Sequence, residues 1–194
     1  MMARIERASL WSLEAYARER NAFRARVIAH KKHRTVQLGE HVTLIFEDEL
    51  TVRYQIQEML RIERIFEEDG IRHELDVYNP LVPNGTNLKA TMMIEYPDVA
   101  ERERELARLK GIEARTWVQV AGFGRVHAIA DEDLERENEE KTSAVHFLRF
   151  ELEAQMRGAL RRGAGLALGV DHPHCQASVE AAAEVRSALA ADLA

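Results

Sequence analysis

The sequence has a single cysteine, Cys175, among its 194 residues. One cysteine excludes an intrachain disulfide and every metal or iron–sulfur site that needs several thiolates. Its apolar runs are only a few residues long, whereas a membrane-spanning helix needs roughly 20 apolar residues. Residues 1–12 also lack the apolar segment of a secretory signal. We therefore expect a cytoplasmic protein that does not span a membrane.

A dominant positive charge is also missing, because 27 Lys and Arg stand against 33 Asp and Glu and the net charge is −6. Nucleic-acid binding needs a basic field, so nucleic acid is excluded as a general partner. The charge is uneven. Residues 18–34 hold seven Lys or Arg and one Glu, and residues 131–140 hold seven acids and one Arg. They are either two solvated faces or docking surfaces, the first for an anionic ligand or an acidic partner.

What is present is the composition of a globular protein, with 46% hydrophobic and 31% charged residues. A chain of this length fits one domain, residues 1–194, which we divide into a helix–hairpin–helix unit at 9–70 and a mixed α+β remainder at 71–194. Ser9 and Ser12 are candidate N-caps for the first helix. The unit is predicted to hold helices at 12–32 and 48–69, the second ending at Gly70, and a hairpin at 35–38 and 42–46.

In the remainder, residues 77–89 (VYNPLVPNGTNLK) are predicted to be irregular because of their prolines, glycine and asparagines. The other expected elements are strands at 90–96, 144–151 and 165–170, a hairpin at 115–121 and 125–130, and helices at 98–111, 154–162 and the alanine-rich C-terminal end. Hairpins imply antiparallel pairing. The sequence therefore predicts an α+β fold with a mainly antiparallel sheet, on which two long N-terminal helices and a C-terminal helix pack.

Charged side chains fall where both long helices should be apolar. Helical periodicity places Glu63 inside the apolar stripe of the second helix, with Glu67 at its edge. It places Arg20 and Arg24 in the middle of the stripe of the first helix. An unpaired buried charge is costly, so we expect the two arginines to face the two glutamates. This cluster is either a structural network or the wall of a polar pocket, unless the stripe is exposed.

The 77–89 segment offers amides and a lysine on a backbone stiffened by proline, which is typical of binding loops; the alternative is that its asparagines only satisfy local turns. His146 shares a strand face with Leu148 and Phe150 by alternation, which is typical of a hydrogen-bonded core histidine. Beside Glu63 and Glu95 it would instead suit iron or manganese. The candidate ligand-binding residues are Arg24, Glu58, Arg61, Glu63, Asn79, Asn87, Lys89, Glu95 and His146.

Two further motifs have simpler interpretations. Residues 171–175, Asp-His-Pro-His-Cys, form the densest cluster of metal-ligand types, but adjacent residues rarely converge on one ion, and we expect a surface turn. Gly122-Phe123-Gly124 lacks the strand-to-helix context of a phosphate loop and is predicted to be a hairpin turn.

The segments AHKKHR, QIQEMLRIERIF, YNPLVPNGTN, KATMMIEYPD, IADEDLERE and VHFLRFEL resemble a bacterial family of about this length that is classified only as a domain of unknown function. The resemblance covers residues 10–173. Members are often encoded next to rubrerythrin-like di-iron proteins and heterodisulfide-reductase-type iron–sulfur proteins. The resemblance implies a role in peroxide or oxygen defence or in electron transfer, and it assigns no catalytic residue.

Three functions follow as hypotheses. The first is an accessory protein of a redox system, which binds a rubrerythrin-like or iron–sulfur partner through residues 18–34 or 131–140. The second is an enzyme or small-ligand binder with a polar pocket around Glu63, Glu95 and His146. The third is a homodimer formed through a hairpin edge or the C-terminal helix. The sequence names no reaction or substrate.

Overall fold

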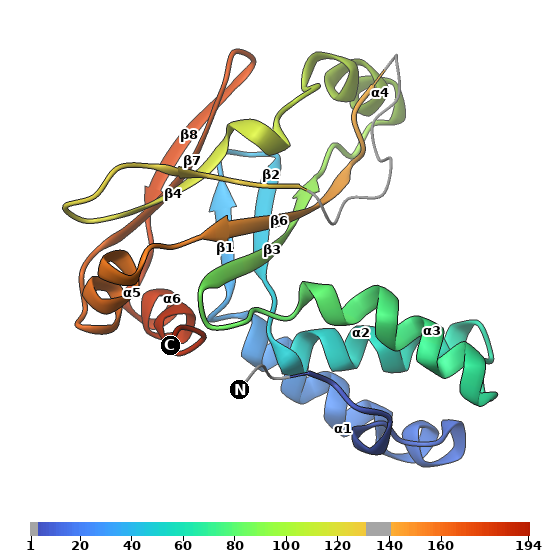
Figure 1. Ribbon diagram of the computed structural model, residues 1–194. Coiled ribbons are helices and arrows are strands. Elements are labelled where there is room, and N and C mark those ends of the chain that lie inside the picture. The colour runs from blue at the N-terminus through green and yellow to red at the C-terminus, as the bar shows by residue number, and fades with distance from the viewer. Residues whose placement is uncertain (1–3, 131–140) are drawn as a thin grey trace.

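The structure is a computed structural model that describes residues 4–130 and 141–194. The predicted α+β class is confirmed (Figure 1). The helices in the described residues are α1 (Leu13–Lys31), α2 (Glu49–Ile62), α3 (Glu68–Tyr78), α4 (Val99–Arg108), α5 (Ala154–Arg161) and α6 (Ala183–Ala190), with 3-10 turns η1 (Arg7–Ser9), η2 (Asn79–Leu81) and η3 (Glu113–Arg115).

The strands form two four-stranded sheets, and every pairing between named strands is antiparallel, as predicted. The first sheet has the order β1-β2-β3-β6, with bounds Thr35–Leu38, Val42–Phe46, Asn87–Ile94 and Val145–Glu151. The second has the order β5-β4-β7-β8, with bounds Val126–His127, Thr116–Val120, Leu166–His172 and Cys175–Glu180.

The two sheets share one hydrophobic core. Alternation along β6 buries every second residue, and the inward faces of both sheets join in a single cluster that includes Leu44, Val118 and Leu168. A pair of 2.8 Å backbone hydrogen bonds between Ile129 and Arg149 links the sheets on one side. α5 and α6 contribute Met156, Leu160, Val185 and Leu189 to the same cluster.

The helices α1, α2 and α3 form a layer at one end of the first sheet (Figure 1). Ser12 caps α1 by accepting from the backbone N–H of Ala15, as expected for a serine N-cap. α1 buries an aromatic face against α2, whereas α2 and α3 share an aliphatic cluster with Ile5 and Leu10. The helical layer therefore has its own apolar contacts, separate from the core between the sheets.

The prediction of one helix over residues 48–69 is wrong, because α2 ends at Ile62 and a separate helix, α3, begins at Glu68. Arg64 adopts a left-handed conformation with φ +55°, and the N–H of Ile65 closes the end of α2 on the carbonyl of Leu60 at 2.9 Å. Gly70 lies inside α3 instead of ending a helix. A Cβ at Gly70 would stand 2.7 Å from Cγ2 of Ile65, so the close approach of that side chain requires glycine.

Three further boundaries differ from expectation. The 77–89 segment is less irregular than predicted, because α3 and η2 extend through Leu81 and β3 begins at Asn87. Strand β8 was not predicted; it pairs with β7 along an edge where most side chains are exposed, so its apolar signal is weak. The predicted surface turn at 171–175 is confirmed only for Pro173 and His174, because Asp171 and His172 belong to β7, Cys175 begins β8, and His172 is buried. The subdivision at residue 70 falls inside α3, and the single-domain organisation stays a prediction.

Candidate functional site

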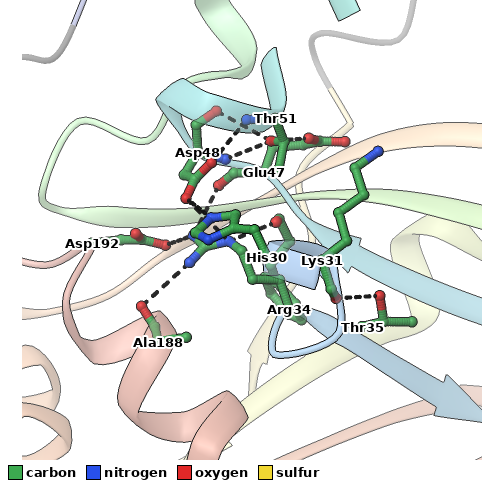
Figure 2. A network of polar contacts seen from close by, with 10 residues as sticks. His30, Lys31, Arg34, Thr35, Glu47, Asp48, Thr51, Ala188 and Asp192 are labelled. Atoms are coloured by element: carbon green, nitrogen blue, oxygen red, sulfur yellow. Dashed lines mark hydrogen bonds and ion pairs between the residues drawn. The ribbon is translucent and has the colours of Figure 1, made fainter. Parts of the chain in front are cut away.

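A buried arginine lies where α1, β1, β2 and α6 meet. The side chain of Arg34 is 2% exposed. Its Nε donates to the carbonyl of Phe46 at 3.0 Å, and its two Nη atoms reach the carbonyls of Glu47 and Ala188 at 3.4 Å each. Nη2 also forms an ion pair with the carboxylate of Asp192 (Figure 2). Arg34 thus holds the residues after α6 against the end of β2.

Two carboxylates share this guanidinium and differ in their proton affinity. Oδ2 of Asp48 lies 3.4 Å from Nε of Arg34 and 2.5 Å from Nε2 of His30. Burial opposes the ionisation of Asp48, but Arg34, the Thr51 N–H and His30 together hold its pKa below the ordinary value. Burial raises the pKa of Asp192 to about 7, against the lowering effect of Arg34 and with the Asp48 charge adding to the rise.

Asp48 is also the N-cap of α2. Its Oδ1 accepts from the N–H of Thr51 at 3.0 Å, and its own N–H donates to the Thr51 hydroxyl at 2.9 Å, which completes a capping box. The Thr51 hydroxyl donates in turn to Oε2 of Glu47. The Thr91 hydroxyl donates to Oε1 of Glu47 at 2.7 Å. Two hydroxyls therefore fix the Glu47 carboxylate beside the start of α2.

The Glu47 carboxylate lines a pocket of about 250 Å³ between the helical layer and the outer face of the first sheet. Strand register places Ile45, Thr91 and Phe147 side by side across β2, β3 and β6, and they form the floor. The remaining lining residues come from α1, α2, α3, η2 and the next row of the sheet: Lys31, Thr51, Val52, Gln55, Tyr78, Leu81, Met93 and Val145.

Lys31 brings a positive charge to the same pocket. It stands in the last turn of α1, where a cation is favourable, and its side chain extends toward the side on which the Glu47 carboxylate lies (Figure 2). Within residues 4–130 and 141–194, Lys31 and Glu47 form no ion pair with each other or with another side chain. The pocket thus combines one cation and one anion with apolar walls.

A second, more open pocket of about 430 Å³ lies beside the two carboxylates that Arg34 contacts. It is lined by Asp48, Asp192 and the segments 82–85 and 191–194. The N–H of Ala194 donates to the carbonyl of Gly85 at 2.8 Å, which fixes this part of the chain over the start of β3. The polar network of Arg34, Asp48, Asp192, Thr51 and Glu47 therefore connects the walls of the two pockets.

The predicted pairing of Arg20 and Arg24 with Glu63 and Glu67 is wrong. Arg24, Glu63 and Glu67 are exposed, because α2 ends at Ile62 and its apolar stripe does not continue. Arg20 instead binds Glu58 through two hydrogen bonds of 2.7 and 2.9 Å. Tyr16 donates to the same carboxylate at 2.6 Å, and Arg61 donates at 3.2 Å.

The hydrogen bonds from Arg20 are the largest cause that lowers the pKa of Glu58 to about 2, assisted by Tyr16 and Arg61 and opposed by burial. Two predicted site residues, Glu58 and Arg61, therefore do meet. They form part of a network between α1 and α2 and do not line the pocket above the sheet.

The predicted metal set of Glu63, Glu95 and His146 does not form. Glu63 is exposed at the end of α2, and Glu95 is exposed after β3, where it accepts from the Thr43 hydroxyl at 3.3 Å. His146 is buried in β6 with Nε2 2.9 Å from the Thr142 hydroxyl, as expected of a core histidine. In the part of the chain that the structure describes, no group of three or more His, Cys, Asp and Glu side chains could hold a metal ion.

The side-chain amides of Asn79 and Asn87, two of the predicted ligand-binding residues, form hydrogen bonds within the protein. Asn79 accepts from the N–H of Ile5 at 2.8 Å and donates to its carbonyl at 3.1 Å, which ties the N-terminal segment to η2. Asn87 accepts from the N–H of Asn84 and donates to Glu151 at 3.0 Å. Lys89 is buried in β3 and does not line the pocket. The structure thus gives both asparagines structural partners.

Lys31, Arg34, Glu47, Asp48 and Asp192 were not among the predicted site residues. The sequence contains a signal for Asp48, which directly precedes a helix as an N-cap does. It contains none for Asp192, because its partner Arg34 stands 158 positions earlier in the chain. Cys175 is half-buried next to the β7–β8 turn, and burial raises the pKa of its thiol, so a reactive thiolate is disfavoured.

Together these features define an α+β protein with a partly enclosed polar and apolar pocket between a helical layer and an antiparallel sheet. A family model described as "Protein of unknown function (DUF3501)" matches residues 4–193, so the chain belongs to the DUF3501 family. None of the helices in the described ranges is long and apolar enough to cross a membrane.

The chain is also similar to a protein described as a novel protein of unknown function from Burkholderia pseudomallei, whose crystal structure was solved at 1.90 Å resolution. The two share 56% sequence identity, covering 98% of this chain and 100% of that chain, with a TM-score of 0.94. No curated protein matches the chain.

Proposed function

We propose that the protein binds a small organic molecule in the pocket between the helical layer and the first sheet. The observation that supports this proposal is the Glu47 carboxylate, which is held by two hydroxyls and faces a cavity with apolar walls. Ligand sites in proteins are typically concave and apolar, with a few fixed polar groups that orient the ligand. This pocket has that composition, and it is more enclosed than the pocket beside Asp192.

A fragment screen by ligand-observed NMR tests the proposal. The substitution Val145→Phe adds a ring to the pocket lining, so fragments that use the pocket should lose their binding. Val99→Phe, at an exposed position on α4, is the matched control and should leave binding unchanged. Thermal melting of both variants verifies that they fold. Fragments that bind equally well to the Val145→Phe variant, or an absence of pocket binders, would overturn the proposal.

A second proposed function is the docking of an acidic protein partner on α1. α1 lies on the outer side of the helical layer (Figure 1) and exposes Arg18, Arg24, Arg26 and Lys32, in a protein whose net charge is −6. Under this proposal the protein works in the cytoplasm as an accessory to a rubrerythrin-like or iron–sulfur partner. The predicted acidic docking segment, residues 131–140, lies outside the described residues, and the homodimer alternative stays a prediction.

Association with a purified rubrerythrin-like protein, measured by calorimetry at increasing salt, tests this second function. We expect affinity to fall steeply with ionic strength, and to fall further in the double variant Arg24→Glu, Arg26→Glu. The control is Arg4→Glu, an exposed arginine on a different segment, which should have little effect. Absent binding, or binding that neither salt nor the double variant weakens, argues against docking on α1.

A further inference from the structure

Two opposite charges that have no ion-pair partner within residues 4–130 and 141–194 face one small cavity. Glu47 and Lys31 both line the pocket, yet no ion pair joins them in the described part of the chain. We propose that the pocket takes a small amino acid with an apolar side chain, whose ammonium group pairs with Glu47 and whose carboxylate pairs with Lys31. This inference rests on the proposed ligand-binding function and names the class of ligand.

The Glu47 carboxylate is already held in one orientation. The Thr51 and Thr91 hydroxyls hold one oxygen each of the Glu47 carboxylate, but a carboxylate can accept about four hydrogen bonds in total. A partly buried carboxylate without a cation has a strong preference for one. Two of the three N–H donors of an ammonium group would use the remaining acceptor positions, and the hydroxyls would keep the carboxylate oriented.

The positive charge of Lys31 determines which second charged group the ligand needs. A ligand with only an ammonium group would be repelled by Lys31, and a ligand with only a carboxylate would be repelled by Glu47. A zwitterion satisfies both side chains. The side chain of Gln55 lines the same pocket and can donate to a carboxylate or accept from an ammonium group.

The walls and the volume limit the rest of the ligand. Ile45, Val52, Leu81, Met93, Val145 and Phe147 provide an apolar surface. A volume of about 250 Å³ is below the roughly 300–1,000 Å³ of pockets for drug-sized molecules. It therefore favours a ligand of about the size of leucine, methionine or phenylalanine over a nucleotide or a large cofactor.

Calorimetric titration of the intact protein with L-leucine, L-methionine and L-phenylalanine tests the inference. At least one should bind, and its N-acetyl and amide derivatives, which lack the ammonium or the carboxylate charge, should bind at least tenfold more weakly. Glu47→Gln and Lys31→Met should each weaken binding by a similar factor. Glu95→Gln and Lys32→Met are matched controls at exposed positions outside the pocket and should leave it unchanged.

The outcomes separate this inference from the proposed function. If fragments bind and Val145→Phe blocks them, but no amino acid binds, the ligand class is wrong and the pocket function stands. If neither binds, both fail. Equal affinity for the free amino acid and its derivatives also overturns the inference, and because this comparison uses the unsubstituted protein, it does not depend on whether the variants fold.

Discussion

The guanidinium of Arg34 forms a buried ion pair with the carboxylate of Asp192, 158 positions further along the chain. The same guanidinium holds the carbonyl of Phe46 and lies beside Asp48, the cap of α2. A single side chain therefore joins the first hairpin, the second helix and the segment after the last helix.

We expect Arg34→Met to destabilise the protein by about 3–5 kcal/mol, because it leaves buried carboxylates and carbonyls without their donor. Arg4→Met is the control. Its ion pair with Asp76 is exposed, so its loss should cost at most about 1 kcal/mol. Urea unfolding followed by circular dichroism measures both free energies of unfolding. A cost below about 1 kcal/mol for Arg34→Met would show that the network contributes little.

Asp192 gives the stability a characteristic pH dependence. Burial raises its pKa to about 7 from 3.8, so the folded protein holds this proton more tightly than the unfolded chain. Unfolding between these two pKa values releases a proton, and the free energy of unfolding therefore falls as pH rises from about 4 to 7. The charges that face Asp192 are Arg34 and Asp48.

The variant Asp192→Asn should lose this decrease of the unfolding free energy with rising pH. Urea midpoints for both proteins at intervals from pH 4.5 to 8 isolate the effect, because all other ionisable groups are present in both. We expect the difference in unfolding free energy between the two proteins to change by a few kcal/mol across this range. Parallel curves would contradict the raised pKa.

Glu58 contributes in the opposite direction and at lower pH. Its pKa is lowered to about 2 from 4.5, so its stabilising effect is present above pH 4.5 and is lost as pH falls toward 2. At pH 7 we expect Glu58→Gln to cost about 1–3 kcal/mol through weaker hydrogen bonds with Arg20 and Tyr16. Glu63→Gln, five residues later and exposed, should change stability by less than about 0.5 kcal/mol. Thermal denaturation of the two variants at pH 7 and pH 3 compares them directly, and equal losses would contradict the network.

Asn79 should determine how firmly the N-terminal segment is held. Its amide makes two hydrogen bonds to the backbone of Ile5, and Asn79→Ala removes both. We expect hydrogen exchange at the Ile5 amide to accelerate at least tenfold, with a loss of about 1–3 kcal/mol in stability. Asn21→Ala, at an exposed position on α1, is the comparison. Unchanged exchange at Ile5 would show that apolar packing alone holds the segment.

Local signals were sufficient for much of the fold. Ser12 as a helix cap, the hairpin of β1 and β2, and the alternation along β6 each depend on residues close together in the sequence, and the structure has them as predicted. The break after Ile62 was missed because neither proline nor glycine marks it. The left-handed conformation of Arg64 and the packing of Ile65 against Gly70 are tertiary choices that no periodicity reveals.

The site was harder to predict for the same reason. Glu63 was assigned to the apolar stripe by extending a helix that ends one residue earlier, whereas Glu58 occupies the position that Arg20 reaches. Glu47 is recognisable as a site residue only in the folded protein, where the Thr91 hydroxyl of β3 donates to its carboxylate. Arg34 and Asp192 were linked only by the folded chain.

Thr51 connects the two carboxylates that face the two pockets, since its hydroxyl donates to Glu47 and its N–H donates to Asp48. A ligand that pairs with Glu47 would therefore be connected to Asp192 by direct contacts through Thr51, Asp48 and Arg34. Thermodynamic linkage requires any effect of ligand binding on the proton of Asp192 to be mutual. A ligand that shifts the proton affinity of Asp192 by a given factor must itself bind more tightly or more weakly, by that same factor, when Asp192 gains its proton.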